Sequence, residues 1–340
     1  MINIDLTCHC ERRVPDPLPW VPRWVSNPNK FLFLLTILIF VLFLSGCSKK
    51  SKANLLTPGT NVTKITGVCT QIDNSKFPEN KAYVSMLDQN NNPITEFATG
   101  NFSIAEDGKP CAVTEVAKVN NSIDILSAVL VLDRSGSMYG QSTTALNTAA
   151  KSFINGLGMS DQAEIIDFST TVQVTQPFTT NKTALIKTID NAVADGATAF
   201  YDAVAQAITD LSNISGRKLI VAMTDGLDNS STRSANDVIG NANENGVSIF
   251  VVGLNNPSYG GIDSATLKNM ADSSGGRYFE TSTNISTQLT NIFNGILTQI
   301  NNQVNINFRS LVSSRPRTLK FYVNYGSLTA TFERQYSYPR

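Results

Sequence analysis

The chain has 340 residues, of which 41% are hydrophobic and 16% charged, and its acidic and basic residues balance to no net charge. A chain of this length and apolar content can bury a sizeable core in one or two domains. No part of the sequence is basic enough to indicate nucleic-acid binding.

The chain opens with a predicted signal peptide. Residues 31–44 read FLFLLTILIFVLFL, an almost unbroken apolar run that follows a segment with several Arg and Lys residues. A run of 14 residues is shorter than the roughly 20 that a membrane-spanning helix needs. The run ends in LSGC, which resembles the lipobox of bacterial lipoprotein signals. The resemblance implies that residues 1–46 are removed and that Cys47 carries a lipid anchor; the alternative is a short signal anchor that stays uncleaved.

The predicted cleavage limits the chemistry of the remaining chain. His9 is the only histidine and would leave with the leader. Residues 47–340 would then lack the base of a Ser-His-Asp or Cys-His mechanism and the imidazole of a typical zinc site, so we predict no catalytic role. Cys69 and Cys111 would remain as a pair in an oxidising compartment. Such a pair predicts a disulfide, with two free buried thiols as the alternative.

Strand and turn patterns dominate both flanks of the mature chain. Residues 47–61 are polar and aperiodic and predict a flexible tether. Residues 62–122 contain the alternating stretch AYVSMLD and an Asp-Gly turn, and residues 302–340 contain a hairpin that turns at Gly326. An isolated hairpin is only marginally stable in water. We therefore expect residues 302–340 to complete one β-sandwich with residues 62–122.

The middle of the chain, residues 123–301, has a different pattern. Short apolar runs such as AVLVL, KLIVAMT and VSIFVVGL alternate with amphipathic stretches, for example the stripe that begins at Leu146 and recurs every three or four residues up to Leu157. Continuous apolar strands are typical of a sheet that helices cover on both faces. The prediction is an α/β domain with a doubly wound, mostly parallel sheet.

Small oxygen-bearing side chains follow the strands of this predicted sheet. The stretch AVLVLDRSGSM places an Asp and two Ser directly after a buried strand, a Thr lies in a glycine-containing loop, and an Asp ends a later strand. Ligands of open parallel sheets bind beyond the carboxyl ends of the strands. Carboxylates and hydroxyls there suit Mg²⁺, Ca²⁺ or Mn²⁺. The alternative is helix capping and turn chemistry. The candidate metal ligands are Asp133, Ser135, Ser137, Thr198 and Asp225.

These five positions carry a family resemblance over residues 123–301. The pattern Asp-x-Ser-x-Ser, with a Thr and an Asp from two later loops, is similar to the metal-ion-dependent adhesion site of the von Willebrand factor type A family, also called the integrin I-domain-like fold. The resemblance implies that the hydroxyls touch the cation directly and that the carboxylates bind it directly or through water. A cation held in this way attracts an acidic side chain from outside, so the expected partner is a protein that offers an Asp or Glu.

The predicted function joins these observations. We expect a lipoprotein of the bacterial cell envelope, anchored in the outer membrane or displayed at the cell surface, that mediates adhesion by binding an acidic side chain of a protein through its divalent cation. A nucleic acid or a small-molecule substrate is not expected. The alternative is a periplasmic scaffold that uses the metal site to assemble an envelope complex.

Overall fold

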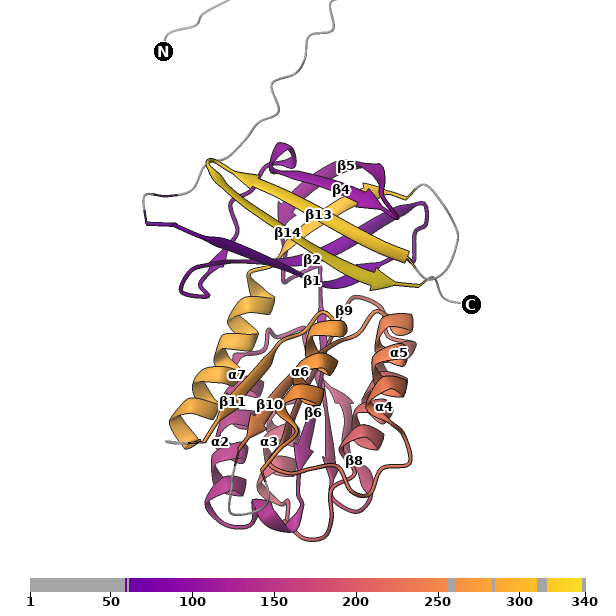
Figure 1. The fold of residues 1–340 in the computed structure, drawn as a ribbon. Coiled ribbons are helices and arrows are strands. Elements are labelled where there is room, and N and C mark those ends of the chain that lie inside the picture. The colour runs from indigo at the N-terminus through magenta and orange to yellow at the C-terminus, as the bar shows by residue number, and fades with distance from the viewer. Residues whose placement is uncertain (1–58, 60, 256–260, 283–284, 311–316, 338–340) are drawn as a thin grey trace, which may run out of the picture. The chain divides into compact units, whose positions relative to one another are not determined.

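The computed structural model describes residues 59, 61–255, 261–282, 285–310 and 317–337. The predicted signal peptide and Cys47 lie outside these residues. The described chain forms an eight-stranded antiparallel sheet and a six-stranded, mostly parallel sheet that helices cover (Figure 1). The predicted doubly wound, mostly parallel α/β fold is confirmed, and the domain predicted as a small β-sandwich is an antiparallel β domain. No described helix has both the length and the apolar character that crossing a membrane requires.

The antiparallel sheet draws its strands from both ends of the described chain. Its strand order is β1-β2-β12-β5-β4-β13-β14, with β3 beside β2, and β1 and β14 at its two ends contact each other. The sheet therefore curls toward a barrel in place of the two packed sheets that a sandwich would have. Its elements are β1 Ile65–Asp73, β2 Glu79–Asp88, β3 Pro93–Ile94, the 3-10 helix η1 Thr99–Asn101, β4 Phe102–Glu106, β5 Lys109–Lys118, β12 Val304–Arg309, β13 Arg317–Tyr325 and β14 Leu328–Tyr336.

The burial of alternate residues shows which face of this sheet lies inside the curl. Along β13, Leu319, Phe321 and Val323 are buried, whereas the intervening Tyr322 and Asn324 are exposed. Period-two burial places every second side chain inside the curl. The inward residues of the other strands join them in one apolar cluster, whose members include Val84, Ile104, Ile306 and Phe308. The core of the β domain thus needs strands from both flanks.

The predicted disulfide between Cys69 and Cys111 is not formed in the structure. Both cysteines are free and buried; the Sγ of Cys69 donates to the carbonyl oxygen of Gln71. Cys69 lies on β1 and Cys111 on β5, and β2 and β12 separate these strands in the sheet. Neighbouring strands are about 4.8 Å apart and a disulfide needs Cα atoms within about 7 Å. Two cysteines on strands this far apart are out of reach of one another.

The second sheet has the order β11-β10-β9-β6-β7-β8, and all its pairs are parallel except β7 with β8. Helices α2, α3 and α7 cover one face, and α4, α5 and α6 cover the other. Its strands are β6 Leu126–Asp133, β7 Gln162–Phe168, β8 Val172–Thr179, β9 Arg217–Thr224, β10 Ser248–Leu254 and β11 Tyr278–Thr281. Its helices are η2 Gly136–Met138, α2 Gln141–Gly156, α3 Lys182–Asp190, α4 Phe200–Ser212, α5 Ala235–Asn245, α6 Ser264–Ser273 and α7 Ile285–Asn301.

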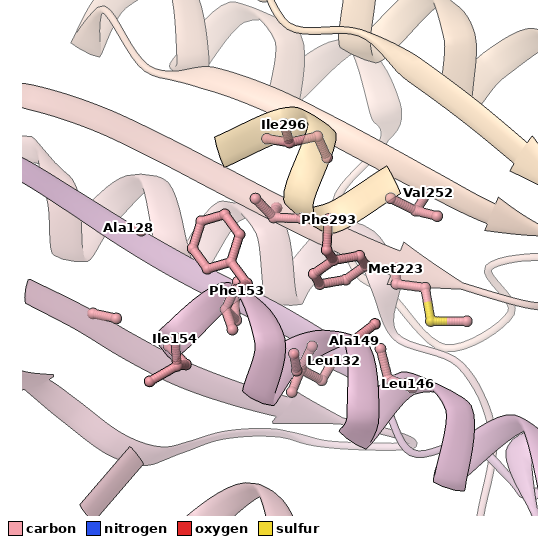
Figure 2. Close-up of a cluster of buried hydrophobic side chains, with 14 of the residues drawn as sticks. Ala128, Leu132, Leu146, Ala149, Phe153, Ile154, Met223, Val252, Phe293 and Ile296 are labelled. Carbon is pink, nitrogen blue, oxygen red and sulfur yellow. The ribbon is translucent and has the colours of Figure 1, made fainter. Parts of the chain in front are cut away.

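Aromatic packing holds α2 and α7 on the sheet. Phe153 of α2 and Phe293 of α7 meet edge to face with ring centroids 6.3 Å apart. Figure 2 shows both rings together with Ala128 and Leu132 of β6. The apolar stripe predicted from Leu146 to Leu157 is the face of α2 that enters this cluster. β6 is therefore covered by α2, the α-helix that follows it in the sequence, and by α7, the last helix of the domain.

Hydrogen bonds join the two chain segments that connect the two sheets. The amide of Val119 donates to the carbonyl oxygen of Gln303 at 2.9 Å, so the entering and leaving segments are bonded to each other. Buried Arg217 donates to the carbonyl oxygens of Asp124 (2.7 Å) and Ile300 (2.9 Å) and to Oδ1 of Asn121 (2.9 Å). One guanidinium thus ties both connections to the start of β9.

Candidate functional site

The candidate site lies where two neighbouring strands end. β6 and β9 are adjacent and parallel, with Leu132 opposite Met223. After β6 the chain continues to α2 on one face of the sheet, whereas after β9 it continues to α5 on the other face. The loops therefore diverge at the carboxyl edge of the sheet, which is where open α/β sheets bind ligands. Asp133 ends β6 and Asp225 follows the last residue of β9.

Asp133 has no exposed surface and is held by two donors. Its Oδ1 accepts a hydrogen bond from the amide of Ser135 at 2.7 Å, and its Oδ2 accepts one from the hydroxyl of Thr224 at 2.7 Å. Sequence reasoning missed Thr224. The sequence feature that could have indicated Thr224 is its position directly before Asp225 in the stretch TDG, where it is the last residue of β9. Both donors fix the carboxylate at the edge of the sheet.

Ser135, Ser137 and Asp225 form a continuous chain of side-chain contacts. The two serine hydroxyls lie 3.1 Å apart, and the hydroxyl of Ser137 donates to Oδ1 of Asp225 at 2.7 Å. The second oxygen of Asp225, Oδ2, is buried and has no hydrogen-bond partner among the described residues. A buried oxygen without a partner is costly. This orphaned oxygen marks the place where a cation or a further donor would be stabilising.

Thr198 is brought to the same place by its loop. Its amide donates to Oδ1 of Asn229 at 2.9 Å, and its carbonyl oxygen accepts from the amides of Asn229 and Ser230. A Cβ placed on Gly226 would lie 3.6 Å from the hydroxyl of Thr198, so the hydroxyl is next to the backbone that follows Asp225. The structure thus brings together all five predicted residues, although they come from three separate loops.

The two carboxyl groups of the site have raised pKa values because they are buried. Burial raises the pKa of Asp133 above its usual range, against the effect of the hydrogen bonds from Ser135 and Thr224. Burial, with a further contribution from the neighbouring Asp133, raises the pKa of Asp225 to about 6, although the hydrogen bond from Ser137 opposes the shift. Groups that are hard to ionise when buried gain most from a nearby positive charge.

The donor set fits a hard divalent cation. All the candidate groups present oxygen, namely two buried carboxylates and three hydroxyls. Among the described residues no group of three or more His, Cys, Asp or Glu side chains is placed to hold a metal, so a cation here would depend on the hydroxyls. Oxygen ligands of this kind suit Mg²⁺, Ca²⁺ or Mn²⁺ and not a soft metal.

The capping alternative explains little of this geometry. Ser135 is the N-cap residue of η2 and Ala199 that of α4, and neither makes a side-chain capping hydrogen bond. Thr198 lies one residue before the cap of α4. Asp133 does form a local turn with the amide of Ser135, but such a turn does not require the distant Asp225.

Two other acidic residues near the site have structural partners. Oδ2 of Asp228 accepts from the amide of Tyr201 and the hydroxyl of Ser231. Asp202 accepts from the amides of Thr232 and Arg233. These contacts join the loop after β9 to the first turn of α4 and so hold Asp225 and Thr198 in place.

Three large apolar side chains are exposed in the segments that carry the site residues. Tyr139 follows the serine motif and is 82% exposed, Val193 lies before Thr198 in the same loop and is 80% exposed, and Leu227 lies shortly after Asp225 and is 51% exposed. Each belongs to one of the three loops that form the site. Large apolar side chains that remain exposed beside a polar centre are typical of a protein-binding surface.

Comparison with known proteins gives a match in sequence for one part of the chain. Residues 128–295 match the family described as von Willebrand factor type A domain. A search of curated proteins gave no match to the chain.

Several solved structures resemble the chain at low identity. Protein BatB from Bacteroides thetaiotaomicron is 16% identical, with 51% of this chain and 98% of that chain covered and a TM-score of 0.44. The vWF domain of the type V pili tip protein Mfa5 from Porphyromonas gingivalis is 14% identical, with 52% and 95% covered and a TM-score of 0.44. PilB minor pilin from Streptococcus sanguinis is 15% identical, with 68% and 92% covered and a TM-score of 0.43.

Proposed function

We propose that the chain is a binding protein whose metal site takes an acidic side chain of a partner protein. The match of residues 128–295 to the von Willebrand factor type A domain supports this proposal. The observation that carries the proposal is the oxygen cluster at the carboxyl edge of β6 and β9, in which a buried oxygen of Asp225 has no partner among the described residues. The residues that would hold the cation are Asp133, Ser135, Ser137, Thr198 and Asp225.

The role of each residue follows from its contacts. The amide of Ser135 and the hydroxyl of Thr224 hold the carboxylate of Asp133 by hydrogen bonds. The hydroxyls of Ser135 and Ser137 form a chain of contacts that ends at the carboxylate of Asp225. A bound Mg²⁺, Ca²⁺ or Mn²⁺ would supply positive charge with room for an oxygen from outside the chain. The apolar rim of Tyr139, Val193 and Leu227 would contact the partner around that oxygen.

The proposal also includes the location of the protein in the cell. The signal-like leader and the LSGC sequence at Cys47 support export and lipid anchoring in the bacterial cell envelope. A lipid on Cys47 would anchor the chain to a membrane, and the tether of residues 47–61 would join that anchor to the domains that carry out adhesion. Labelling with radioactive palmitate, compared between the full chain and a Cys47→Ala variant, tests this part separately.

Calorimetric titration with Mg²⁺ and with Mn²⁺ tests the metal site. We expect saturable binding by the full chain and its loss in a Ser135→Ala, Ser137→Ala double variant, because both hydroxyls lie between the carboxylates. A Ser212→Ala, Ser273→Ala double variant, whose serines lie at the ends of α4 and α6, serves as the matched control and should bind as the wild type does. The titration is repeated with acetate, which supplies an external carboxylate. Absence of binding by the folded wild type in both conditions would refute the proposal.

A further inference from the structure

A cavity of about 470 Å³ opens beside the candidate metal site. It lies between the motif after β6, the turn from β7 to β8 and the end of α3. The amide of Ala199 donates to the carbonyl oxygen of Ser169, and the amide of Asp195 donates to that of Arg134. The cavity wall is therefore bonded directly to the loop that carries Thr198. The polar residues used below are Arg134, Asp167, Thr171, Gln173, Thr175 and Thr188.

Arg134, which lies between Asp133 and Ser135 in the chain, is the unusual part of this wall. Only 3% of the residue is exposed. Its Nε donates to Oδ1 of Asp167 at 2.7 Å and its Nη1 donates to Oδ1 of Asn147 at 2.7 Å. Its Nη2 is buried and has no partner among the described residues. A buried donor left without an acceptor costs about 1–3 kcal/mol, so an acceptor that binds at this wall and reaches Nη2 would be favoured.

The charge of the wall indicates which acceptor fits. Asp167 neutralises the guanidinium and is itself held by the hydroxyl of Thr175, which donates to Oδ2 at 2.8 Å. Arg134 and Asp167 are the only charged residues that line the cavity in the described chain. An anion would thus meet no net positive charge, whereas a neutral carbonyl oxygen needs only the free N–H of Nη2.

The rest of the lining suits a group that also donates. The hydroxyls of Thr171 and Thr188 and the amide of Gln173 offer acceptor oxygens. A primary carboxamide carries one carbonyl acceptor and two N–H donors. It therefore matches a neutral wall with one unsatisfied donor and several acceptors better than a carboxylate or an apolar side chain does.

We propose that this cavity binds the side-chain carboxamide of an Asn or Gln on the same partner whose acidic side chain meets the cation. The inference rests on the proposed function and adds a second specificity element to it. Arg134 is the chain neighbour of Asp133 and Ser135, and consecutive Cα atoms are about 3.8 Å apart. The carboxamide of the partner and its Asp or Glu would then belong to one short segment of the partner chain.

Selection from a phage-displayed library of random octapeptides tests this inference on the full chain. Peptides are bound in Mg²⁺ and eluted with EDTA. We expect an Asp or Glu accompanied by an Asn or Gln at a fixed spacing. The best peptide is then synthesised with its amide residue intact and with that residue replaced by Leu. Wild type should bind the amide form about tenfold more tightly, as expected for one buried hydrogen bond.

The role of Arg134 is tested by the ratio of these two affinities. Lysine at this position keeps a positive charge toward Asp167 but lacks Nη2, so Arg134→Lys should bring the ratio close to one. Thr188→Val, which leaves the contacts of Arg134 intact, should lower the ratio, whereas Thr183→Val on the exposed side of α3 should not. These two substitutions keep the test decisive if Arg134→Lys fails to fold.

The outcomes separate the two proposals. Acidic peptides without an amide at fixed spacing, a second acid at that spacing, or a ratio that neither Arg134→Lys nor Thr188→Val changes would overturn the carboxamide site and leave the proposed function standing. If no peptide is released by EDTA, the proposed function fails, and the carboxamide site fails with it.

Discussion

The hydroxyl of Ser137 donates a hydrogen bond to Oδ1 of Asp225 at 2.7 Å, across a separation of 88 residues in the chain. This bond joins the loop after β6 to the loop after β9, the two loops that leave the sheet toward opposite faces. It also leaves the other oxygen of Asp225 buried and without a partner among the described residues. A buried carboxylate oxygen without a hydrogen-bond partner lowers the stability of the folded protein.

Replacing Asp225 by Asn should stabilise the metal-free protein. Burial raises the pKa of Asp225 to about 6, so keeping it ionised at pH 7.5 costs stability, on the order of 1–3 kcal/mol. Asn keeps the acceptor for Ser137 without the charge. Thermal unfolding in EDTA should show a higher Tm for Asp225→Asn, and added Mg²⁺ should raise the Tm of wild type only. The exposed Asp190→Asn serves as control; a lower Tm in EDTA for Asp225→Asn would contradict the prediction.

Glu164 should make the stability depend on pH. Its side chain lies on β7 under α4, and burial together with nearby Asp210 raises its pKa from 4.5 to about 8. The folded state then holds a proton that the unfolded chain releases above about pH 4.5. Stability is therefore fully present below that pH and falls as the pH rises through 8, by up to about 1.4 kcal/mol per pH unit.

A Glu164→Gln variant isolates this effect. Gln cannot ionise, so its stability should stay flatter between pH 5 and pH 8.5, and the variant should gain most over wild type at the alkaline end. Urea unfolding in EDTA at several pH values measures the difference. Glu244→Gln, an exposed change on α5, is the control. Parallel profiles for wild type and Glu164→Gln would count against the assignment.

Arg217 should be essential for the junction between the two sheets. Its three donations reach Asp124, Asn121 and Ile300, and a lysine could not make all of them from one site. We expect Arg217→Lys to destabilise the protein by about 2–4 kcal/mol. Hydrogen exchange should become faster at the amide of Val119, which bonds to Gln303. Arg233→Lys on the surface should leave both quantities unchanged; equal effects from the two variants would exclude the special role of Arg217.

Cys69 and Cys111 should behave as protected thiols. Burial raises the pKa of Cys69 to about 12 and also raises the pKa of Cys111, so little reactive thiolate exists at pH 8. We expect neither residue to react with iodoacetamide in the native protein, and both to react after denaturation without reductant. Peptide mass spectrometry reads both sites, and a disulfide-linked peptide pair would show that the pairing argument from strand order is wrong.

The α/β domain could be predicted in detail because its signals are local. The apolar run AVLVL lies within β6, and the stripe from Leu146 is the buried face of α2. The five oxygen-bearing residues were found because a parallel sheet brings the carboxyl ends of its strands to one edge.

The remaining features depend on contacts between distant segments. Period-two patterns predict strands but not that β12 enters between β2 and β5, which is why the β domain was expected as a sandwich and the cysteines as a bonded pair. Arg134 occupies a position that the pattern Asp-x-Ser-x-Ser leaves unspecified. Its free Nη2 follows only from the positions of Asp167 and Asn147, which no local pattern encodes.

The position of β6 has a mechanical consequence. Its carboxyl end carries Asp133, while its first residue follows directly on the connection that Arg217 ties. Both long sides of β6 are hydrogen-bonded, to β7 and to β9. A pull on a partner held at Asp133 would act along the strand, so the bonds on both sides would have to break together in shear and not one after another. The two chain segments that connect the α/β domain to the β domain would then carry this force together.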